Sequence, residues 1–372
     1  MNDSIAVIEL TPTGLRFLDQ TRLPGEEVMV ATADHRDVLE AIRALRLRGA
    51  PLIGITAAYG VTLAARAWCA AHSAPADTAA ALTRTQDFLA YLHDVCESFA
   101  ATRPTAVNLF WALDRMRCLL ARPLAPEALT PEALAPESFT PEAFTAALEA
   151  EAHAIHDDDA QRCAAIGRHG AALLPRGAGV ITHCNSGALA TGGEGTAFAV
   201  LLEAHRQGRG IHVFADETRP LLQGARLTMW ELRRHDIPST LITDGTAAML
   251  MRAGRVAAAI TGADRIAANG DTANKIGTYA LAVAARHHGI PFYIAAPLST
   301  VDNRIPTGAD IPIEERDPAE ITMLAGRRIA PEGVHVYAPA FDVTPAELIA
   351  GFVTERGILA PPYGETLAAA LS

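Results

Sequence analysis

The sequence predicts an α/β protein in which a parallel β-sheet with helices on both faces follows a smaller, mostly helical N-terminal domain. The length of 372 residues is enough for about two domains of roughly 150 residues each. Helical periodicity dominates up to residue 120, and short apolar strands alternate with helices beyond residue 165. This alternation is typical of a parallel sheet that is buried on both faces.

The N-terminal domain, residues 1–147, begins with weakly alternating apolar residues around a turn at 11–14, which predicts a short antiparallel strand pair. Helical segments are predicted at residues 37–46, 53–71, 94–101 and 104–120. Residues 123–143 then repeat a five-residue unit: LAPEA, LTPEA, LAPES and FTPEA. Proline at this density interrupts a helix, so we interpret the repeat as a linker or surface insertion.

The C-terminal domain, residues 148–372, supplies the strands of the predicted sheet. These strands are expected at residues 178–183, 211–215, 240–243, 256–261, 291–296 and 335–337. Helices are expected at residues 196–206, 221–235, 247–253, 276–288 and 345–352. The last helix is predicted from a capping box, in which Thr344 precedes Pro345 at the first helical position and Glu347 completes the motif.

The charge balance argues against a nucleic-acid partner. The chain has 31 basic and 42 acidic side chains, a formal net charge of −11, and no run of five basic residues. A membrane span needs about 20 largely apolar residues, and the stretches at 256–263 and 290–297 are far shorter. The first residues have no basic segment typical of a secretory signal. We therefore expect no membrane association.

The five cysteines indicate free thiols in a reducing cytoplasm. They are odd in number and never spaced as CxxC, which argues against a disulfide framework or a zinc ribbon. A cytoplasmic location is the expectation that follows.

Polar and glycine-rich residues follow the predicted strands at unusual density. The segments are HCNSG at 183–187 with TGGEGT at 191–196, DETRP at 216–220, TDGT at 243–246, TGADR at 261–265 and PLST at 297–300. Because parallel strands end at one edge of the sheet, these segments are expected to meet there and to form an active site.

Each candidate residue also has a plainer interpretation. Cys184 could be a small buried apolar residue, although its place at a strand end favours a function. His183 more plausibly bonds a backbone group than a metal, since no second ligand follows at metal-binding spacing, and we expect no metal. The glycines do not spell GxGxxG or a phosphate-binding P-loop, and no GxSxG surrounds Ser186. A nicotinamide dehydrogenase, a nucleotide hydrolase and a serine hydrolase are therefore disfavoured.

Three places are candidates for binding an anion. Arg48, Gly49 and Ala50 lie at a break between predicted helices, where backbone N–H groups can face a phosphate. Asn274 and Lys275 are expected to open a helix, and Arg103 precedes another.

Taken together, these strings resemble the S-methyl-5-thioribose-1-phosphate isomerase family, which shares its fold with regulatory subunits of a translation-initiation exchange factor. The strings are RGAPLIG (48–54), RPTAVNLFWAL (103–113), THCNSGALATGGEGTA (182–197), ADETRPLLQGARLTMWEL (215–232), GADRIAANGDTANKIGTYALAV (262–283), APLSTVD (296–302), IPIEERDP (311–318) and PAFDVTP (339–345). The resemblance covers nearly the whole chain, and the repeat at 123–143 is the main part outside it. Gly245-Thr246 and Ala338 depart from its usual pattern.

The resemblance implies a Rossmann-like second domain, a homodimer, and conversion of methylthioribose 1-phosphate to methylthioribulose 1-phosphate in methionine salvage without a cofactor. Cys184 and Asp264 match the family's catalytic pair. The positions that match its substrate-binding residues are Arg48, Gly49, Ala50, Arg103, Gln223, Asn274 and Lys275. Two alternatives stay open: an isomerase of 5-deoxyribose 1-phosphate or ribose 1,5-bisphosphate, and a non-catalytic subunit of the initiation-factor type.

The chemistry of such a substrate assigns expected roles. A sugar phosphorylated at C1 cannot open spontaneously, so the ring oxygen must be protonated as it leaves, and hydrogen must then move from C2 to C1. We expect Asp264 to be the acid, with its pKa raised by desolvation. Cys184 is either the base that takes the C2 proton or a neutral group that stabilises charge during a hydride shift. The N-terminal domain is expected to supply a lid through Arg48–Ala50 and Arg103.

Overall fold

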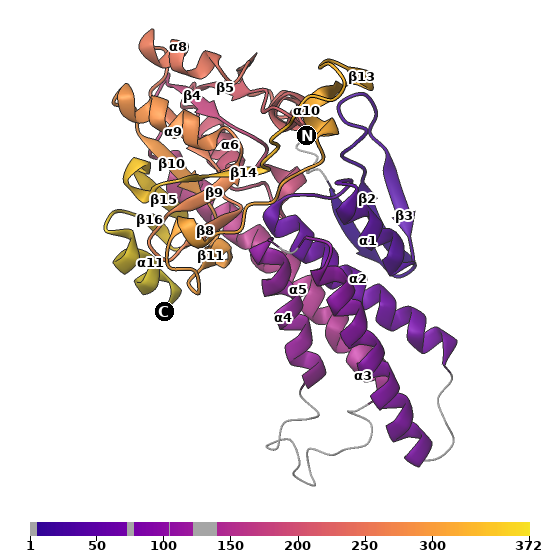
Figure 1. Ribbon diagram of the computed structural model, residues 1–372. Coiled ribbons are helices and arrows are strands. Elements are labelled where there is room, and N and C mark those ends of the chain that lie inside the picture. Colours follow the sequence, from indigo (N-terminus) through magenta and orange to yellow (C-terminus); the bar gives the residue numbers. More distant parts are fainter. Residues whose placement is uncertain (1–5, 73–77, 104, 122–139) are drawn as a thin grey trace. The chain divides into compact units, whose positions relative to one another are not determined.

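The computed structural model describes residues 6–72, 78–103, 105–121 and 140–372 (Figure 1). Contacts between Cα atoms divide the chain into two compact units, Met1–Asp159 and Ala160–Ser372. The Pro-Glu repeat lies outside the described residues up to position 139. Its last unit contributes Pro141, at which a long helix begins.

The first unit combines a small antiparallel sheet with long helices. Strands β1 (Ile8–Thr11) and β2 (Gly14–Leu18) form the predicted pair, and β3 (Met29–Thr32) adds a third strand beside β2. The helices are α1 (His35–Arg43), α2 (Ala50–Ala71), α3 (Thr78–Ala100), α4 (Val107–Ala121) and the first part of α5 (Pro141–Ala171). Helix α3 is much longer than the predicted segment 94–101, and α5 was not predicted.

Helix α2 is the core of this unit. Nearly all of its first four turns are buried, and glycines let neighbouring helices approach it closely. A Cβ at Gly54 would lie 2.5 Å from the backbone oxygen of Asn108 on α4. Among the described residues, α2 alone has the length and hydropathy of a membrane span, and 78% of its apolar window is buried inside the structure, as in a core helix.

The second unit is built on a seven-stranded sheet in the order β16-β15-β10-β7-β4-β5-β6. Its strands are β4 (Gly179–Thr182), β5 (His212–Asp216), β6 (Ser239–Ile242), β7 (Ala258–Thr261), β10 (Phe292–Ala295), β15 (Gly351–Thr354) and β16 (Gly357–Leu359). All neighbours pair in parallel except β16, which is antiparallel to β15. The predicted parallel sheet is thus confirmed.

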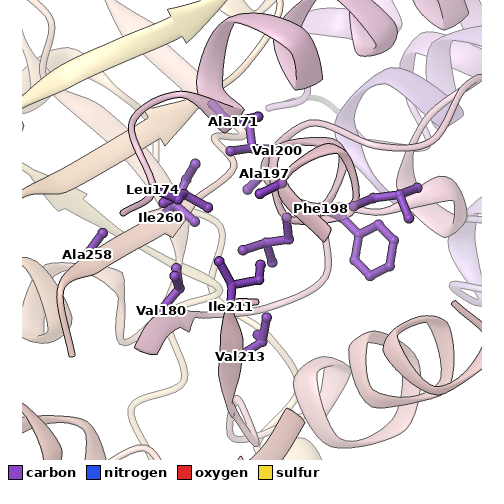
Figure 2. Packing of buried hydrophobic residues seen from close by; sticks show 14 of the residues in the cluster. Ala171, Leu174, Val180, Ala197, Phe198, Val200, Ile211, Val213, Ala258 and Ile260 are labelled. Carbon is purple, nitrogen blue, oxygen red and sulfur yellow. The ribbon is translucent and has the colours of Figure 1, made fainter. Parts of the chain in front are cut away.

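Helices cover both faces of this sheet, because successive strand residues point to opposite sides. On one face, Val180, Val213 and Ile260 pack against helix α6 (Ala197–Arg206), as Figure 2 shows. On the other face, Ile181 and Phe214 pack with three further helices. These are α8 (Thr246–Arg252), α9 (Thr278–His287) and α11 (Tyr363–Leu371).

A second sheet, of four strands, was not predicted. Its order is β11-β8-β9-β14, with β11 at Val301–Asp302, β8 at Arg265–Ala267, β9 at Thr272–Lys275 and β14 at Phe341–Thr344. Residues 323–328 add a small hairpin, β12 (Met323–Leu324) with β13 (Arg327–Arg328). The short helix α10 (Ala319–Thr322) precedes this hairpin.

Several predicted elements are wrong. Residues 335–337 form no strand, and the helix expected at 345–352 is replaced by a 3₁₀ turn at Ala346–Leu348 and by β15. The capping-box pattern is overridden because Thr344 pairs with Thr272 in β14, and Phe352 and Val353 are buried between β10 and β16. The helix predicted at 221–235 begins as a π-helical turn at Gly224–Thr228 and continues as α7 (Met229–Arg234).

Replacing Gly54 by alanine is expected to lower the free energy of unfolding by about 1–3 kcal/mol, since the new methyl group overpacks α2 against α4. The gain in helix propensity, about 1 kcal/mol, does not offset this overpacking. Gly364→Ala is the matched control, because that glycine is exposed on helix α11 and no atom lies within 4 Å of a new Cβ. Urea unfolding measures both variants. A Gly54→Ala protein as stable as the wild type would contradict the close packing.

Candidate active site

Cys184 lies in a tightly bonded loop after β4. Its φ of 64° is a left-handed backbone conformation, which non-glycine residues rarely adopt. The backbone N–H of Cys184 donates to Thr218 Oγ1 at 2.8 Å, and its carbonyl accepts from Thr228 Oγ1 at 2.6 Å. The residue is half-buried. Hydrogen bonds on both sides therefore fix the backbone that carries this thiol.

Asp264 follows β7, the strand that pairs directly with β4. Its backbone N–H donates to the carbonyl of Ala273 at 2.9 Å, and the residue is half-buried. The two loops are close, since a Cβ at Gly262 would lie 3.1 Å from Cβ of Ser186. Cys184 and Asp264 thus follow neighbouring parallel strands at the same edge of the sheet.

His183 is buried and bonded through both ring nitrogens. Nε2 lies 2.9 Å from the carbonyl oxygen of Ile276, and Nδ1 lies 3.0 Å from Asp216 Oδ2. A carbonyl can only accept, so Nε2 carries a hydrogen. The close contact of Nδ1 with the carboxyl group then needs a further proton, held on either the ring or Asp216. The pair therefore holds one proton more than a neutral imidazole beside an ionised carboxylate.

The environment favours this bound proton. Burial raises the pKa of Asp216 to about 6. Burial alone would lower the pKa of His183, but the hydrogen bond and charge of Asp216 outweigh that effect and raise it. Gly277 fits against the ring only because it lacks a Cβ, which would lie 2.7 Å from His183 Cε1.

His183, Asp216 and Asp244 bring potential ligand atoms within 4.8 Å of one another. The nitrogens of His183 are engaged by Ile276 and Asp216, as above. The two oxygens of Asp244 accept from the backbone N–H groups of Thr218 and Arg219, both at 2.8 Å. Of these three side chains, only Asp216 Oδ1 has no hydrogen-bond partner among the described residues, so they fit a hydrogen-bonded network better than a metal site.

A buried glutamate supports the same loop and was missed by sequence reasoning. Glu231 on α7 is fully buried and accepts from Asn185 Nδ2 at 2.6 Å and from the backbone N–H of Ala188 at 2.7 Å. Gly187 allows this approach, since a Cβ there would lie 2.2 Å from the glutamate oxygen. The sequence showed only a charged residue within a predicted helix, and nothing in that pattern indicates burial.

Asn274 and Lys275 lie near the same edge, but they do not open a helix. They end β9, and α9 begins three residues later, after Gly277 turns the chain at a φ of 104°. The prediction was wrong because the antiparallel pairing of β9 with β14 extends through both residues. Asn274 is buried and donates to Thr278 Oγ1 at 3.0 Å, and Lys275 Nζ lies 4.6 Å from the centre of the Phe341 ring.

Gln223 immediately precedes the π-helical turn and is 5% exposed. Its Oε1 atom is buried and has no hydrogen-bond partner among the described residues. Buried acceptors are normally satisfied, so this oxygen is a candidate for a contact with a ligand.

The remaining candidates belong to the first unit. Gly49, with a φ of 107°, is the N-cap of α2, and Ala50 and Pro51 form its first turn. Arg48 is buried, and its Nε donates to Gln20 Oε1 at 3.0 Å. Arg103 is half-buried between α3 and α4. The predicted exposed backbone amides at 49–50 thus lie at a true helix N-terminus, whereas α4 begins only at Val107.

The shared proton predicts how stability depends on pH. The folded pair retains its proton above about pH 6.5, where an unfolded histidine releases one, so the free energy of unfolding should fall as pH rises. The slope approaches about 1.4 kcal/mol per pH unit for one proton. In Asp216→Asn, the amide donates to a neutral His183 and the pair needs no extra proton, so the fall should be shallower. Urea unfolding between pH 6.5 and 8.5 measures both slopes, and equal slopes would exclude the shared proton.

Comparison with known proteins agrees with this geometry. The model of the Initiation factor 2 subunit family matches residues 46–361. Methylthioribose-1-phosphate isomerase of Geobacter metallireducens is 50% identical over 366 residues, which cover 98% of this chain and 99% of that protein. The crystal structure of 5-methylthioribose 1-phosphate isomerase from Pyrococcus horikoshii OT3 is 41% identical with a TM-score of 0.84, covering 98% of this chain and 95% of that chain.

The crystal structure of the translation initiation factor eIF-2B, subunit delta, from A. fulgidus is 38% identical with a TM-score of 0.81, and 99% of both chains are covered. The family resemblance inferred from the sequence is confirmed. This chain belongs to the Initiation factor 2 subunit family and, within it, to the methylthioribose-1-phosphate isomerases.

Proposed function

We propose that this chain is an aldose–ketose isomerase of methionine salvage. It converts S-methyl-5-thio-α-D-ribose 1-phosphate to S-methyl-5-thio-D-ribulose 1-phosphate. The observation that carries the proposal is the placement of Cys184 and Asp264 on adjacent strand ends, in a chain 50% identical to an isomerase over nearly its whole length.

The reaction exchanges oxidation levels between two carbons of one molecule, so it needs no external electron acceptor. Asp264 donates a proton to the ring oxygen as its bond to C1 breaks. Hydrogen then moves from C2 to C1, and the hydroxyl proton at C2 is lost as the ketone forms. The Asp264 carboxylate, left ionised by the first step, can receive that proton.

Cys184 has two possible roles in the hydrogen transfer. As a thiolate it removes the C2 proton and leaves an enol phosphate, which is then protonated at C1. As a neutral thiol it stabilises charge while hydride passes directly from C2 to C1. The reaction in D₂O separates the two, since only the first introduces solvent deuterium at C1.

Binding of the sugar phosphate uses residues of both proposed domains, 1–147 and 148–372. The unpaired oxygen of Gln223 accepts a hydrogen bond from a sugar hydroxyl, which would satisfy a buried polar atom. Lys275 and Asn274 provide a cation and an amide at the end of β9, next to Ile276, whose carbonyl is bonded by His183. In the first domain, the proposed phosphate-binding groups are Arg48, Arg103 and the N-terminal amides of α2 at Gly49 and Ala50.

We propose that a cleft of about 410 Å³ binds the methylthio group. It is lined by Arg219, Pro220, Ile276, Ile321, Tyr337 and Pro339, and four of these six side chains are proline or isoleucine. The carbonyl of Ile276 is the one bonded by His183, which connects the cleft with the Cys184 loop. Tyr337 and Pro339 flank Ala338, one of the departures from the family pattern, so this cleft sets the preference for the 5-substituent.

The setting proposed for the enzyme is a homodimer in the cytoplasm. It acts on a small sugar phosphate, without a nucleic-acid or membrane partner. The free cysteines and the acidic surface support this setting. A non-catalytic role as an initiation-factor subunit is the second candidate, favoured by the likeness to the A. fulgidus structure.

Purified protein should turn over methylthioribose 1-phosphate with a kcat/KM at least tenfold above that for 5-deoxyribose 1-phosphate or ribose 1,5-bisphosphate. The apolar cleft favours a thioether over a second phosphate, and transfer of one methyl-sized group is worth about a factor of ten or more. A coupled assay for the ketose measures all three. Preference for ribose 1,5-bisphosphate would assign a different isomerase, and no turnover of any of them would favour the non-catalytic subunit.

Asp264→Asn should lower kcat by at least 100-fold and change substrate affinity by less than about fivefold, because an amide cannot protonate the ring oxygen. Asp236→Asn is the matched control. That aspartate is exposed, precedes β6 at the opposite edge of the sheet, and has a φ of 54°, which asparagine tolerates. Steady-state kinetics and ligand titration provide the numbers. An Asp264→Asn enzyme with near-normal kcat would remove Asp264 from its role as the acid.

A further inference from the structure

Two neighbouring residues at the carboxyl edge of the main sheet have left-handed backbones. Cys184 has a φ of 64° and Thr218 a φ of 66°. For a β-branched residue such as Thr218, this conformation is a genuine outlier. Conformations of this kind persist only where the surrounding structure imposes them, and they cluster at functional sites.

Asp244 imposes the conformation of the turn at Thr218. Its two carboxylate oxygens accept from the backbone N–H groups of Thr218 and Arg219, each at 2.8 Å. The turn is enclosed from the other side by Gly224, where a Cβ would lie 1.7 Å from the carbonyl oxygen of Asp216. Thr218 itself is fully buried. Its side chain therefore has a fixed position and direction.

The hydroxyl of Thr218 connects this fixed turn to the backbone of Cys184. Oγ1 donates to the carbonyl of Asp216 at 3.1 Å, so its remaining capacity is as an acceptor. It accepts the backbone N–H of Cys184 at 2.8 Å. The chain of contacts thus runs from a carboxylate after β6, through a threonine after β5, to the cysteine after β4.

We propose that Thr218 and Asp244 are positioning residues, which hold the backbone of Cys184 in its left-handed conformation and thereby aim the thiol at the substrate. The inference rests on the proposed function, since it assumes that Cys184 acts on the sugar phosphate. Neither residue needs to touch the substrate. Their loss should therefore lower turnover while substrate affinity is largely retained.

The test compares Thr218→Val with Thr218→Ser in the full-length chain. Valine keeps the β-branched shape and removes only the hydroxyl, whereas serine keeps the hydroxyl. Thr354→Val is the matched control, because the buried hydroxyl of Thr354 also donates to a carbonyl, that of Gly357 at 2.9 Å, and accepts a backbone N–H, that of Arg356 at 3.2 Å. Asp244→Asn is the second variant, since an amide offers one acceptor oxygen where two N–H groups require two.

Two measurements are made on each variant. Steady-state kinetics with methylthioribose 1-phosphate give kcat and KM separately. Hydrogen–deuterium exchange resolved at the amide of residue 184 reports the hydrogen bond directly. Thr218→Val should lose at least 30-fold in kcat with KM changed less than threefold, and the amide should exchange at least tenfold faster. Thr218→Ser and Thr354→Val should keep kcat within about threefold of the wild type, and Asp244→Asn should follow Thr218→Val.

Three results would overturn the inference alone: normal kcat in Thr218→Val, an equal loss in Thr218→Ser, or unchanged exchange at residue 184. If Thr218→Val does not fold, Asp244→Asn decides by the same criteria. A wild-type chain that turns over none of the three sugar phosphates overturns both the proposed function and the inference. An active wild type with an unimpaired Thr218→Val leaves the proposed function standing.

Discussion

The arrangement of the candidate site in the second unit depends on the two hydrogen bonds of one buried imidazole. His183 follows β4, and its ring contacts Asp216 at the end of β5 and the carbonyl of Ile276 beyond β9. Three segments far apart in the sequence are thereby fixed to one another. Cys184 is the next residue after His183, and Lys275 is the residue before Ile276. The contact with Ile276 uses the one ring hydrogen of a neutral imidazole, so the contact with Asp216 depends on the further proton that the pair retains.

Three aspartates of this unit each accept two backbone N–H groups. Asp244 accepts two backbone N–H groups, Asp271 accepts those of Gly308 and Ala346, and Asp342 accepts those of Gly277 and Tyr279. Each carboxylate is thus stabilised by peptide dipoles rather than left as an open charge. A net charge of −11 is therefore compatible with a phosphorylated substrate, because binding depends on the local potential and not on the total.

The sequence predicted the main sheet because strands buried on both faces are continuous apolar runs, as at residues 256–261. It also predicted a site at the carboxyl ends of the strands. Cys184 and Asp264 were candidate residues of that site because each follows a predicted strand. It did not predict β8, β9 and β14: β8 and β9 are short strands paired with each other, and β9 is completed only by β14, which lies far later in the chain. It included Thr218 only as part of the segment 216–220 and gave no sign of Glu231, since burial of a glutamate and a positive φ at a threonine are decided by residues distant in the chain.

The two outermost strands of the seven-stranded sheet differ. One edge is the antiparallel strand β16, and the other is β6, only four residues long, with Pro238 before it and Asp244 after it. An open edge is a template on which strands of other chains can add, and shortness, proline and charge all discourage that growth. Asp244, described above as the anchor of a turn, thus also places a charge directly beyond this edge strand. One carboxylate serves both the turn beside the candidate site and the open side of the sheet, where charge discourages pairing with another chain.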